Sequence, residues 1–278
     1  MKILINLLKT PAFVVGIGLF VLTLLMAYIF PMFYHVDTVT RVGMPYMGPS
    51  AQYWLGTNHL GVDMVSLLVK GLRASLYVGL LAGIIATIVG TLLGIYAGYT
   101  GGLQDDIINL ITNLFIVIPQ MVLLILISSS VKEGRSLALI AFIIGATGWT
   151  WSARAVRAQS SSLKSRDHIS LAKINGTGTF GIVVKHILPY ILSYVFMVFI
   201  MQTASGILSE AAISMIGLGP YDSVSLGTIL NEAMRNEALT DGAWWAFIPA
   251  AILVTITAFS LYVLNNSMEG VFNPRLRK

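Results

Sequence analysis

Six long stretches with almost no charged residues constrain the fold of this chain more than any other feature. They lie at residues 12–34, 75–98, 107–130, 136–153, 190–210 and 244–264. Each is close to the roughly 20 residues that an α-helix needs to cross the hydrocarbon core of a bilayer. The whole chain is 56% hydrophobic and only 10% charged, which lies outside the usual range of soluble domains. We therefore predict an all-α, polytopic membrane protein with six transmembrane helices, of which the fourth is the shortest.

The positions of the lysines and arginines predict which connections face the cytoplasm. If the N-terminus is cytoplasmic, the cytoplasmic set is Lys2, Lys9, Arg154, Arg157, Lys164, Arg166, Lys173, Lys185, Arg275, Arg277 and Lys278, and the outer set is Arg41, Lys70, Arg73, Lys132, Arg135 and Arg235. Basic residues favour the cytoplasmic side of a plasma membrane, so we expect both termini and residues 154–189 inside, and residues 35–73 and 217–243 outside. The pI of about 9.4 then reflects contact with membrane lipid and requires no nucleic acid.

These patterns divide the chain into three parts. Residues 1–74 are predicted to form an N-terminal anchor helix and an external segment. The first apolar stretch outlasts that of a cleavable signal sequence, so we expect it to remain as an anchor. Residues 75–272 form the core domain with its cytoplasmic loop at 154–189, and residues 273–278 form a cytoplasmic tail.

The polar segment 154–189 contains the signals of one short helix. Asp167 is the expected N-cap, because its carboxylate can accept hydrogen bonds from the free amides of the first turn. Lys173 lies near the expected C-terminal end, and Gly176 can close the helix in a left-handed conformation. A helix of about eight residues spans roughly 12 Å and is marginal alone in water. We expect it to be stabilised by docking against a partner or against its own membrane domain.

Few polar residues lie at membrane depth, and ionisable ones are nearly absent. The candidates to line a pathway are Gln120, Gln202, Ser205 and Glu210. A hydrogen bond from Gln120 to a neighbouring helix remains the alternative to a contact with substrate. Pro119 is expected to kink the third span. The lack of buried charges argues against coupling to protons or sodium ions.

Five glycines follow one face of the second span. They are Gly79, Gly83, Gly90, Gly94 and Gly98, at spacings of four and seven residues. Such a face lets another helix approach closely. The pattern favours packing inside this chain, with a sliding or dimer contact as the alternative.

The sequence lacks the groups that an energy-converting or catalytic site requires. It has no cysteine, and its four histidines are scattered without metal-ligand spacing. No lysine follows the glycine pattern of a phosphate-binding loop, and no Ser-His-Asp or paired-carboxylate arrangement stands out. We therefore predict no metal, no cofactor and no catalytic residue. A transport protein of this kind needs an external motor, and the cytoplasmic helix is the obvious place to attach one.

The same helix carries a resemblance to a known family. The run from Ser170 to Gly176, followed by Leu188 and Pro189, resembles the cytoplasmic EAA loop of ATP-binding-cassette (ABC) importer permeases. The spacing from glycine to proline fits that loop, whereas the acidic residue of the Glu-Ala-Ala triplet is replaced by Ser170. The letters Glu-Ala-Ala do occur at Glu210, but at the outer end of the fifth span. That second triplet is not the coupling loop.

Motifs along nearly the whole chain are similar to the second-type permease subunit of the dipeptide, oligopeptide and nickel transporter family. They are Pro49-Ser50, Trp54–Asn58, Leu60–Asp63, Gly71–Ser75, Gly98–Gly102, Gly148-Trp149, Ala153-Arg154, Arg157, His186–Pro189, Glu210–Gly219 and Asn273–Arg277. Three positions depart from the family pattern. Asn58 stands where aspartate is usual, Val62 where arginine is usual, and Asn273 where aspartate is usual.

The resemblance implies a fold, partners and roles for particular residues. The fold is a methionine-permease-like (MetI-like) core. The partners are a homologous permease in a heterodimer, two ABC ATPase subunits, an extracytoplasmic substrate-binding protein and a peptide substrate. The residues implied in ATPase coupling are Asp167, Ser170, Leu171, Ala172, Lys173, Ile174 and Gly176. Import of nickel chelates, glutathione or oligosaccharides, or export of peptides, remains an alternative within this architecture, and a secondary transporter or a pore remains one from another class.

Overall fold

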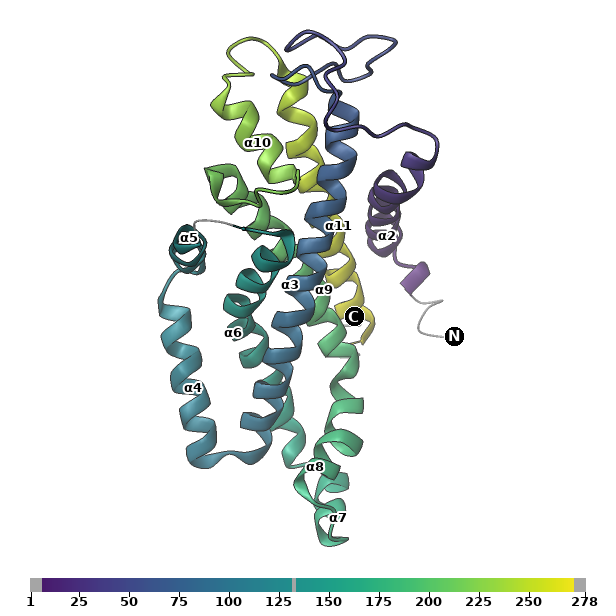
Figure 1. The fold of residues 1–278 in the computed structure, drawn as a ribbon. Coiled ribbons are helices and arrows are strands. Elements are labelled where there is room, and N and C mark those ends of the chain that lie inside the picture. The colour runs from purple at the N-terminus through teal and green to yellow at the C-terminus, as the bar shows by residue number, and fades with distance from the viewer. Residues whose placement is uncertain (1–6, 132–133, 273–278) are drawn as a thin grey trace.

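The computed structural model describes residues 7–131 and 134–272, and helices are the only regular structure within them (Figure 1). They are α2 (Pro11–Leu24), η1 (Leu25–Ile29), η2 (Phe30–Met32), α3 (Met64–Thr100), α4 (Gly102–Val117), α5 (Gln120–Ser130), α6 (Leu137–Lys164), α7 (Asp167–Ile174), α8 (Thr179–Ile182), η3 (Val183–Ile187), α9 (Leu188–Ile213), η4 (Ser214–Leu218), α10 (Leu226–Arg235), η5 (Trp244–Ala246) and α11 (Ile248–Phe272). One isolated antiparallel bridge pairs Thr57 with Asp63. The predicted all-α class is confirmed.

Five helical segments are long and apolar enough to cross a membrane. They are Pro11–Met32, Met64–Thr100, Leu137–Lys164, Thr179–Leu218 and Trp244–Gly270. The pair formed by α4 and α5 gives a sixth if it is counted as one span. The prediction that the fourth span is the shortest was wrong, because α6 has 28 residues. The apolar stretch ends at the first arginine, but the helix continues through charged residues to Lys164.

The third predicted span is broken into two helices. Ile118 and Pro119 have extended backbones, with φ/ψ of −85°/121° and −55°/126°, and α5 is bent by 81° from α4. The proline ring disfavours helical dihedrals at the preceding residue and removes one amide donor. The predicted effect of Pro119 is thus confirmed, and it is a complete break in the helix. In Figure 1, α5 is seen almost end-on beside the bundle.

The long helix α3 runs through the centre of the bundle and packs against α6 and α9 along the glycine face. Gly79 and Gly83 lie against Ile207 and Thr203 of α9, and the other three glycines lie against α6. A Cβ at Gly94 would come within 2.6 Å of the Ala153 carbonyl oxygen. The glycines therefore allow close helix packing within this chain, as the pattern favoured. The predicted domain boundary at residue 74 falls inside α3, so this helix joins the first two predicted parts.

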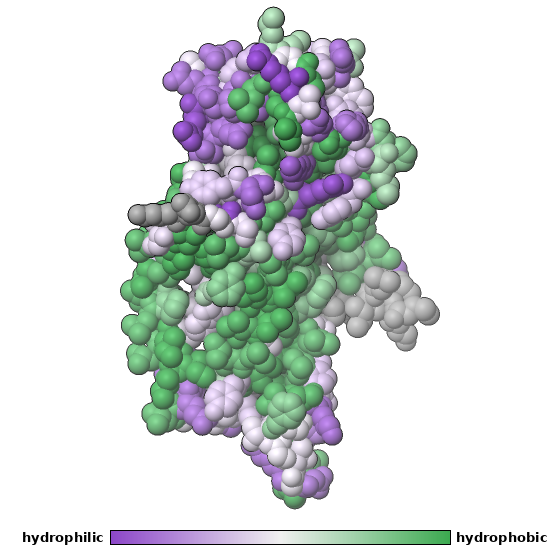
Figure 2. Space-filling model, viewed as in Figure 1, coloured by the Kyte–Doolittle hydropathy of each residue, from purple (hydrophilic) through white to green (hydrophobic). Residues whose placement is uncertain are grey.

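Several connections lie at two opposite ends of the bundle. One end, here called the α7 end, holds α7, α8 and the turn between α3 and α4; the other, the α10 end, holds residues 33–63 and α10 (Figure 1). Figure 2 shows a hydrophobic belt between two more polar ends. This grouping of connections agrees with the one expected from the charges. The predicted tail at 273–278 lies outside the described residues.

Side-chain hydrogen bonds hold residues 33–63 in place at the α10 end. Tyr46 donates from its hydroxyl to the Asn236 carbonyl at 2.9 Å, and Trp245 Nε1 donates to the Thr57 carbonyl at 3.1 Å. The buried Asn58 accepts at Oδ1 from two backbone amides, each at 2.9 Å. An aspartate at this position would accept the same two bonds. The departure of Asn58 from the family pattern therefore preserves the turn.

Asp63 caps the N-terminus of α3. Its Oδ2 accepts from the Ser66 amide at 2.8 Å, which satisfies one of the free donors of the first turn. Tyr34 donates its hydroxyl proton to the same oxygen at 3.0 Å. Burial and the adjacent carboxylate raise the pKa of Tyr34 to about 12, so the tyrosine remains a donor at neutral pH.

Candidate coupling and transport site

The short helix predicted in the polar segment is present as α7. It runs from Asp167 to Ile174, and its N-cap is Arg166, whose backbone is extended at φ/ψ of −77°/144°. The prediction that Asp167 is the N-cap was wrong, because Asp167 already has a helical backbone and makes no capping bond. Its exposed carboxylate lies in the first turn, where the positive end of the helix dipole still favours it.

Gly176 ends α7 as predicted. Its φ of +74° is left-handed, and apart from its chain neighbours nothing lies within 4 Å of the position a Cβ would occupy. The Gly176 amide donates to the Lys173 carbonyl and the Thr177 amide donates to the Ala172 carbonyl, both at 3.0 Å. These two bonds form a Schellman motif, in which glycine avoids the strain of a side chain at positive φ.

Four side chains seat α7 on its own chain. Ile169 is fully buried and Ala172 is 5% exposed. The ring of His168 stacks on that of Tyr190 in α9, with centroids 4.7 Å apart. Lys173 places Nζ 5.3 Å from the centroid of the Tyr99 ring at the end of α3. Ala172 and Lys173 therefore contact this chain, although sequence reasoning assigned both to a partner.

The opposite face of α7 leaves large apolar side chains uncovered. Leu171 is 60% exposed and Ile174 is 80% exposed, and Phe180 of α8 beside them is 82% exposed. These three residues are called the α7 patch. Ser170 and Gly176 are also exposed at its edge. A cluster of protruding apolar side chains at a polar end of a membrane protein is typical of a protein contact.

Polar contacts brace the helices above α7. Arg157 of α6 makes a bidentate ion pair with Asp105 of α4, with both N–O distances 2.6 Å. Arg154 donates to Asn113 Oδ1 at 2.8 Å. Sequence reasoning counted the two arginines as cytoplasmic charges and as part of the family motifs, and it assigned them no partner. Their spacing of three residues along one helix was a signal that both could face the same neighbour.

Two of the four predicted pathway residues lie inside the subunit. Gln202 donates from Nε2 to the Gly148 carbonyl at 2.7 Å and so ties α9 to α6. Glu210 has no exposed surface, and it accepts from the hydroxyls of Ser75 and Ser214, each at 2.7 Å. Ser75 in turn accepts from the Leu226 amide at 3.2 Å. The residues Ser75, Glu210 and Ser214, here called the Glu210 cluster, thus join α3, α9 and α10.

Gln120 and Ser205 are the two predicted pathway residues that keep free polar atoms. Both side chains are partly exposed, and neither makes a hydrogen bond to the rest of the described chain. Gln120 lies at the break between α4 and α5, with Nε2 beside Gly148 of α6. Within residues 7–131 and 134–272, no group of three or more histidine, aspartate or glutamate side chains is placed to hold a metal ion.

The bundle, its broken third span and its seated end helix define a multi-helix membrane transport subunit. The chain belongs to the family of inner membrane components of binding-protein-dependent transport systems, whose model matches residues 90–278. It is a multi-pass permease subunit of an ABC importer. This class works with ATPase partners and a substrate-binding protein.

Characterised permeases resemble the chain over most of its length. It is 31% identical to the oligopeptide transport system permease protein OppC of Bacillus subtilis (strain 168), over 95% of this chain and 86% of the relative. It is 29% identical to the dipeptide transport system permease protein DppC of the same strain, over 94% and 79%. It is 34% identical to OppC of Escherichia coli (strain K12), over 81% and 73%.

Proposed function

We propose that this chain forms one half of the translocation pathway of an ATP-driven importer of short peptides. The names of its relatives support peptides as the cargo. The other half is a homologous permease, two ABC ATPases bind at the α7 end, and a binding protein delivers peptide at the α10 end. Both termini and the α7 end are cytoplasmic, in keeping with the distribution of basic residues. ATP hydrolysis belongs to the ATPase subunits.

The observation that carries this proposal is the two-sided character of α7. One side is fixed to α3 and α9 through Ile169, Ala172 and two ring contacts, and the other side presents the α7 patch. A helix held in this way moves as one body with the bundle. ATPase closure on the patch therefore transmits a push to the membrane helices, and the Arg157–Asp105 pair carries it to α4.

The coupling residues divide into three roles. Leu171 and Ile174 enter a groove on the ATPase, and Asp167 and Ser170 make polar contacts at its rim. Ala172 and Lys173 hold the seat, and Gly176 sets the exit of the chain. In the membrane, Gln120 and Ser205 line the pathway, whereas Gln202 and Glu210 fix the helices around it.

Site-directed cross-linking tests the ATPase contact, because the chain has no cysteine of its own. Ile174→Cys, labelled with a thiol-reactive photocrosslinker, is expected to join the ATPase subunit in native membranes. Ala172→Cys is the matched control, since that position is two residues away on the buried side of the same helix. Equal cross-linking from both positions, or none from Ile174→Cys, would contradict the assignment.

Transport measurements test the cargo and the role of Gly176. The purified complex with its binding protein is expected to hydrolyse ATP faster with di- to pentapeptides than with a nickel chelate, glutathione or an oligosaccharide.

Gly176→Val forces a branched side chain into positive φ, so it should abolish peptide uptake while the subunit still inserts. Peptide uptake at the normal rate in Gly176→Val would remove Gly176 from the coupling site.

A further inference from the structure

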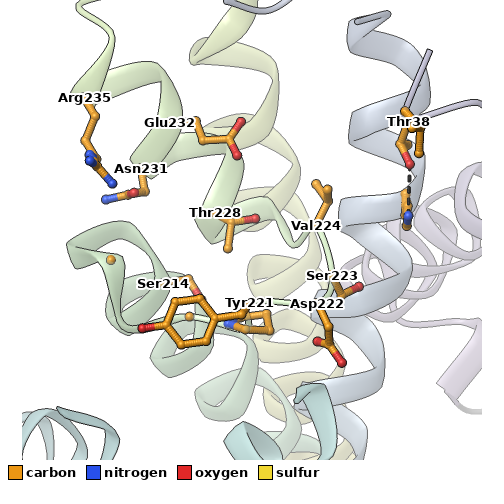
Figure 3. A pocket seen from close by; sticks show the side chains of 15 residues that line it. Thr38, Ser214, Tyr221, Asp222, Ser223, Val224, Thr228, Asn231, Glu232 and Arg235 are labelled. Atoms are coloured by element: carbon orange, nitrogen blue, oxygen red, sulfur yellow. Dashed lines mark hydrogen bonds between the residues drawn. The ribbon is translucent and has the colours of Figure 1, made fainter. Parts of the chain in front are cut away.

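A polar pocket of about 400 Å³ opens at the α10 end, beyond the hydrophobic belt. Its walls are α10, the outer part of α3, Thr38, and the chain between η4 and α10. Figure 3 shows Thr228, Asn231, Glu232 and Arg235 on α10 above Ser214, Tyr221 and Asp222. The volume lies within the range of about 300–1,000 Å³ that is usual for small-molecule sites.

Lys70 is the more buried of the two cations that line the pocket. It projects from α3, is half-buried, and donates from Nζ to the Thr38 hydroxyl at 2.9 Å, the bond drawn in Figure 3. No carboxylate oxygen of the described residues lies within 4.0 Å of it. An ammonium group that is partly withdrawn from water and lacks an anion gains most from a charged acceptor. Lys70 is therefore a ready site for a carboxylate.

The remaining walls supply the opposite charge and hydrogen-bonding groups. Asp222 is exposed and makes no ion pair with any other described residue, and Glu232 is 47% exposed, with His59 4.0 Å away. Asn231 donates from Nδ2 to the Met215 carbonyl, which leaves its Oδ1 as an acceptor. Arg235 adds a second cation at the exposed rim. Both signs of charge around one small polar space suit a zwitterion better than an acyl chain or an apolar anchor of a protein.

We propose that this pocket binds the free ends of a short peptide on its way into the pathway. Lys70 binds the C-terminal carboxylate, and Asp222 with Glu232 attracts the N-terminal ammonium group. Ser214 forms part of the lining and donates to Glu210, so a bound peptide rests directly above the Glu210 cluster. This inference rests on the proposed peptide cargo and adds a specific site for it in the permease.

Equilibrium binding of radiolabelled trialanine to the complete importer in lipid nanodiscs, without its binding protein, tests the site. Lys70→Gln keeps a shorter, polar side chain but removes the charge, and is expected to weaken trialanine binding about tenfold. Trialanine amide should bind the wild type and Lys70→Gln equally. Arg41→Gln is the matched control, since Arg41 is a cation of the same end that does not line the pocket.

A second arm tests the amino end. Asp222→Asn should weaken trialanine about threefold, because Glu232 remains, and should leave N-acetyl-trialanine unchanged. Equal losses for free and blocked peptides, or equal effects of Lys70→Gln and Arg41→Gln, would overturn the site. If Lys70→Gln loses the binding protein but still binds trialanine normally, the pocket is instead a docking site for that protein, and the proposal is wrong. If the wild type also fails to take up peptide with its binding protein, the proposed cargo fails as well.

Discussion

The short helices α7 and α10 lie at opposite ends of the membrane bundle, and they are built differently. α10 begins with a capping box, in which Ser225 Oγ accepts from the Thr228 amide at 3.1 Å and Thr228 Oγ1 accepts from the Ser225 amide at 2.8 Å. It buries Leu226, Ile229 and Leu230 almost completely. α7 has no side-chain cap and buries only Ile169 and Ala172.

The difference shows that α10 is stabilised by its own chain, whereas α7 leaves an apolar face available to a partner. α10 buries its apolar residues in the core of this chain, and its polar residues line a pocket. α7 leaves Leu171 and Ile174 exposed and buries only Ile169 and Ala172 on its own chain, so a partner completes its burial. A helix of eight residues cannot be stable alone, and the chain supplies only part of what it needs.

The largest expected effect comes from removing the carboxylate that anchors α10. Glu210→Ala leaves the hydroxyls of Ser75 and Ser214 without their acceptor and creates a cavity, so it should lower the free energy of unfolding by about 3 kcal/mol. Thermal unfolding of the purified subunit in nanodiscs measures this loss. Glu210→Gln keeps the volume and one acceptor and should cost less than half as much. An unchanged melting temperature in Glu210→Ala would mean that the cluster does not hold the α10 end.

The next largest effect is on binding of the ATPase, and it distinguishes the α7 end from the α10 end. Ile174→Asp should weaken ATPase binding by at least about 2 kcal/mol, because it removes a central apolar anchor of the α7 patch. Met234→Asp is the control, since Met234 is an exposed apolar residue of α10. Co-purified ATPase per permease measures the effect, and both variants should melt like the wild type. Equal loss of ATPase from both variants would show that the α7 patch is not the specific binding surface for the ATPase.

The helix starts offer a sharper comparison of intrinsic stability. Ser225→Ala removes the acceptor of the capping box and should cost about 1 kcal/mol at the α10 end. Arg166→Ala changes the N-cap of α7, which makes no side-chain bond, and should cost almost nothing. Hydrogen exchange of the first-turn amides measures both. A larger increase in exchange in α7 after Arg166→Ala than in α10 after Ser225→Ala would reverse the expected order.

The smallest effect is expected from the brace beside α7. Asp105→Asn removes one charge of the Arg157 pair, whose two side chains are 16% and 35% exposed. Water and salt screen such a pair, so the loss should be about 0.5 kcal/mol and should shrink at high salt. Melting temperatures at low and high salt test this. If the pair carries motion to α4, the rate of peptide uptake should fall clearly even though the melting temperature changes little.

The membrane spans and the end of α7 could be predicted from the sequence, because both depend on residues that are close together along the chain. Apolar length sets a membrane helix, Pro119 breaks one, and Gly176 permits a left-handed exit. Sequence reasoning failed at the start of α7, where the cap depends on whether the backbone of Arg166 or of Asp167 is the last extended one. It also assigned Ala172 to the partner, although this side chain is buried against its own chain. The sequence of an eight-residue helix does not show which of its sides packs on the rest of the chain.

The sequence by itself determined an all-helical membrane subunit, its order of spans and the family to which it belongs. Only the tertiary structure decided that the buried Glu210 joins three helices, that the α7 patch lies opposite a seated face, and that Lys70 faces a pocket without a carboxylate partner within the described ranges. Spans follow from the transfer of local segments into lipid, which is additive along the chain. Partners of a polar side chain depend on which distant helices pack beside it, and that is a property of the assembled bundle.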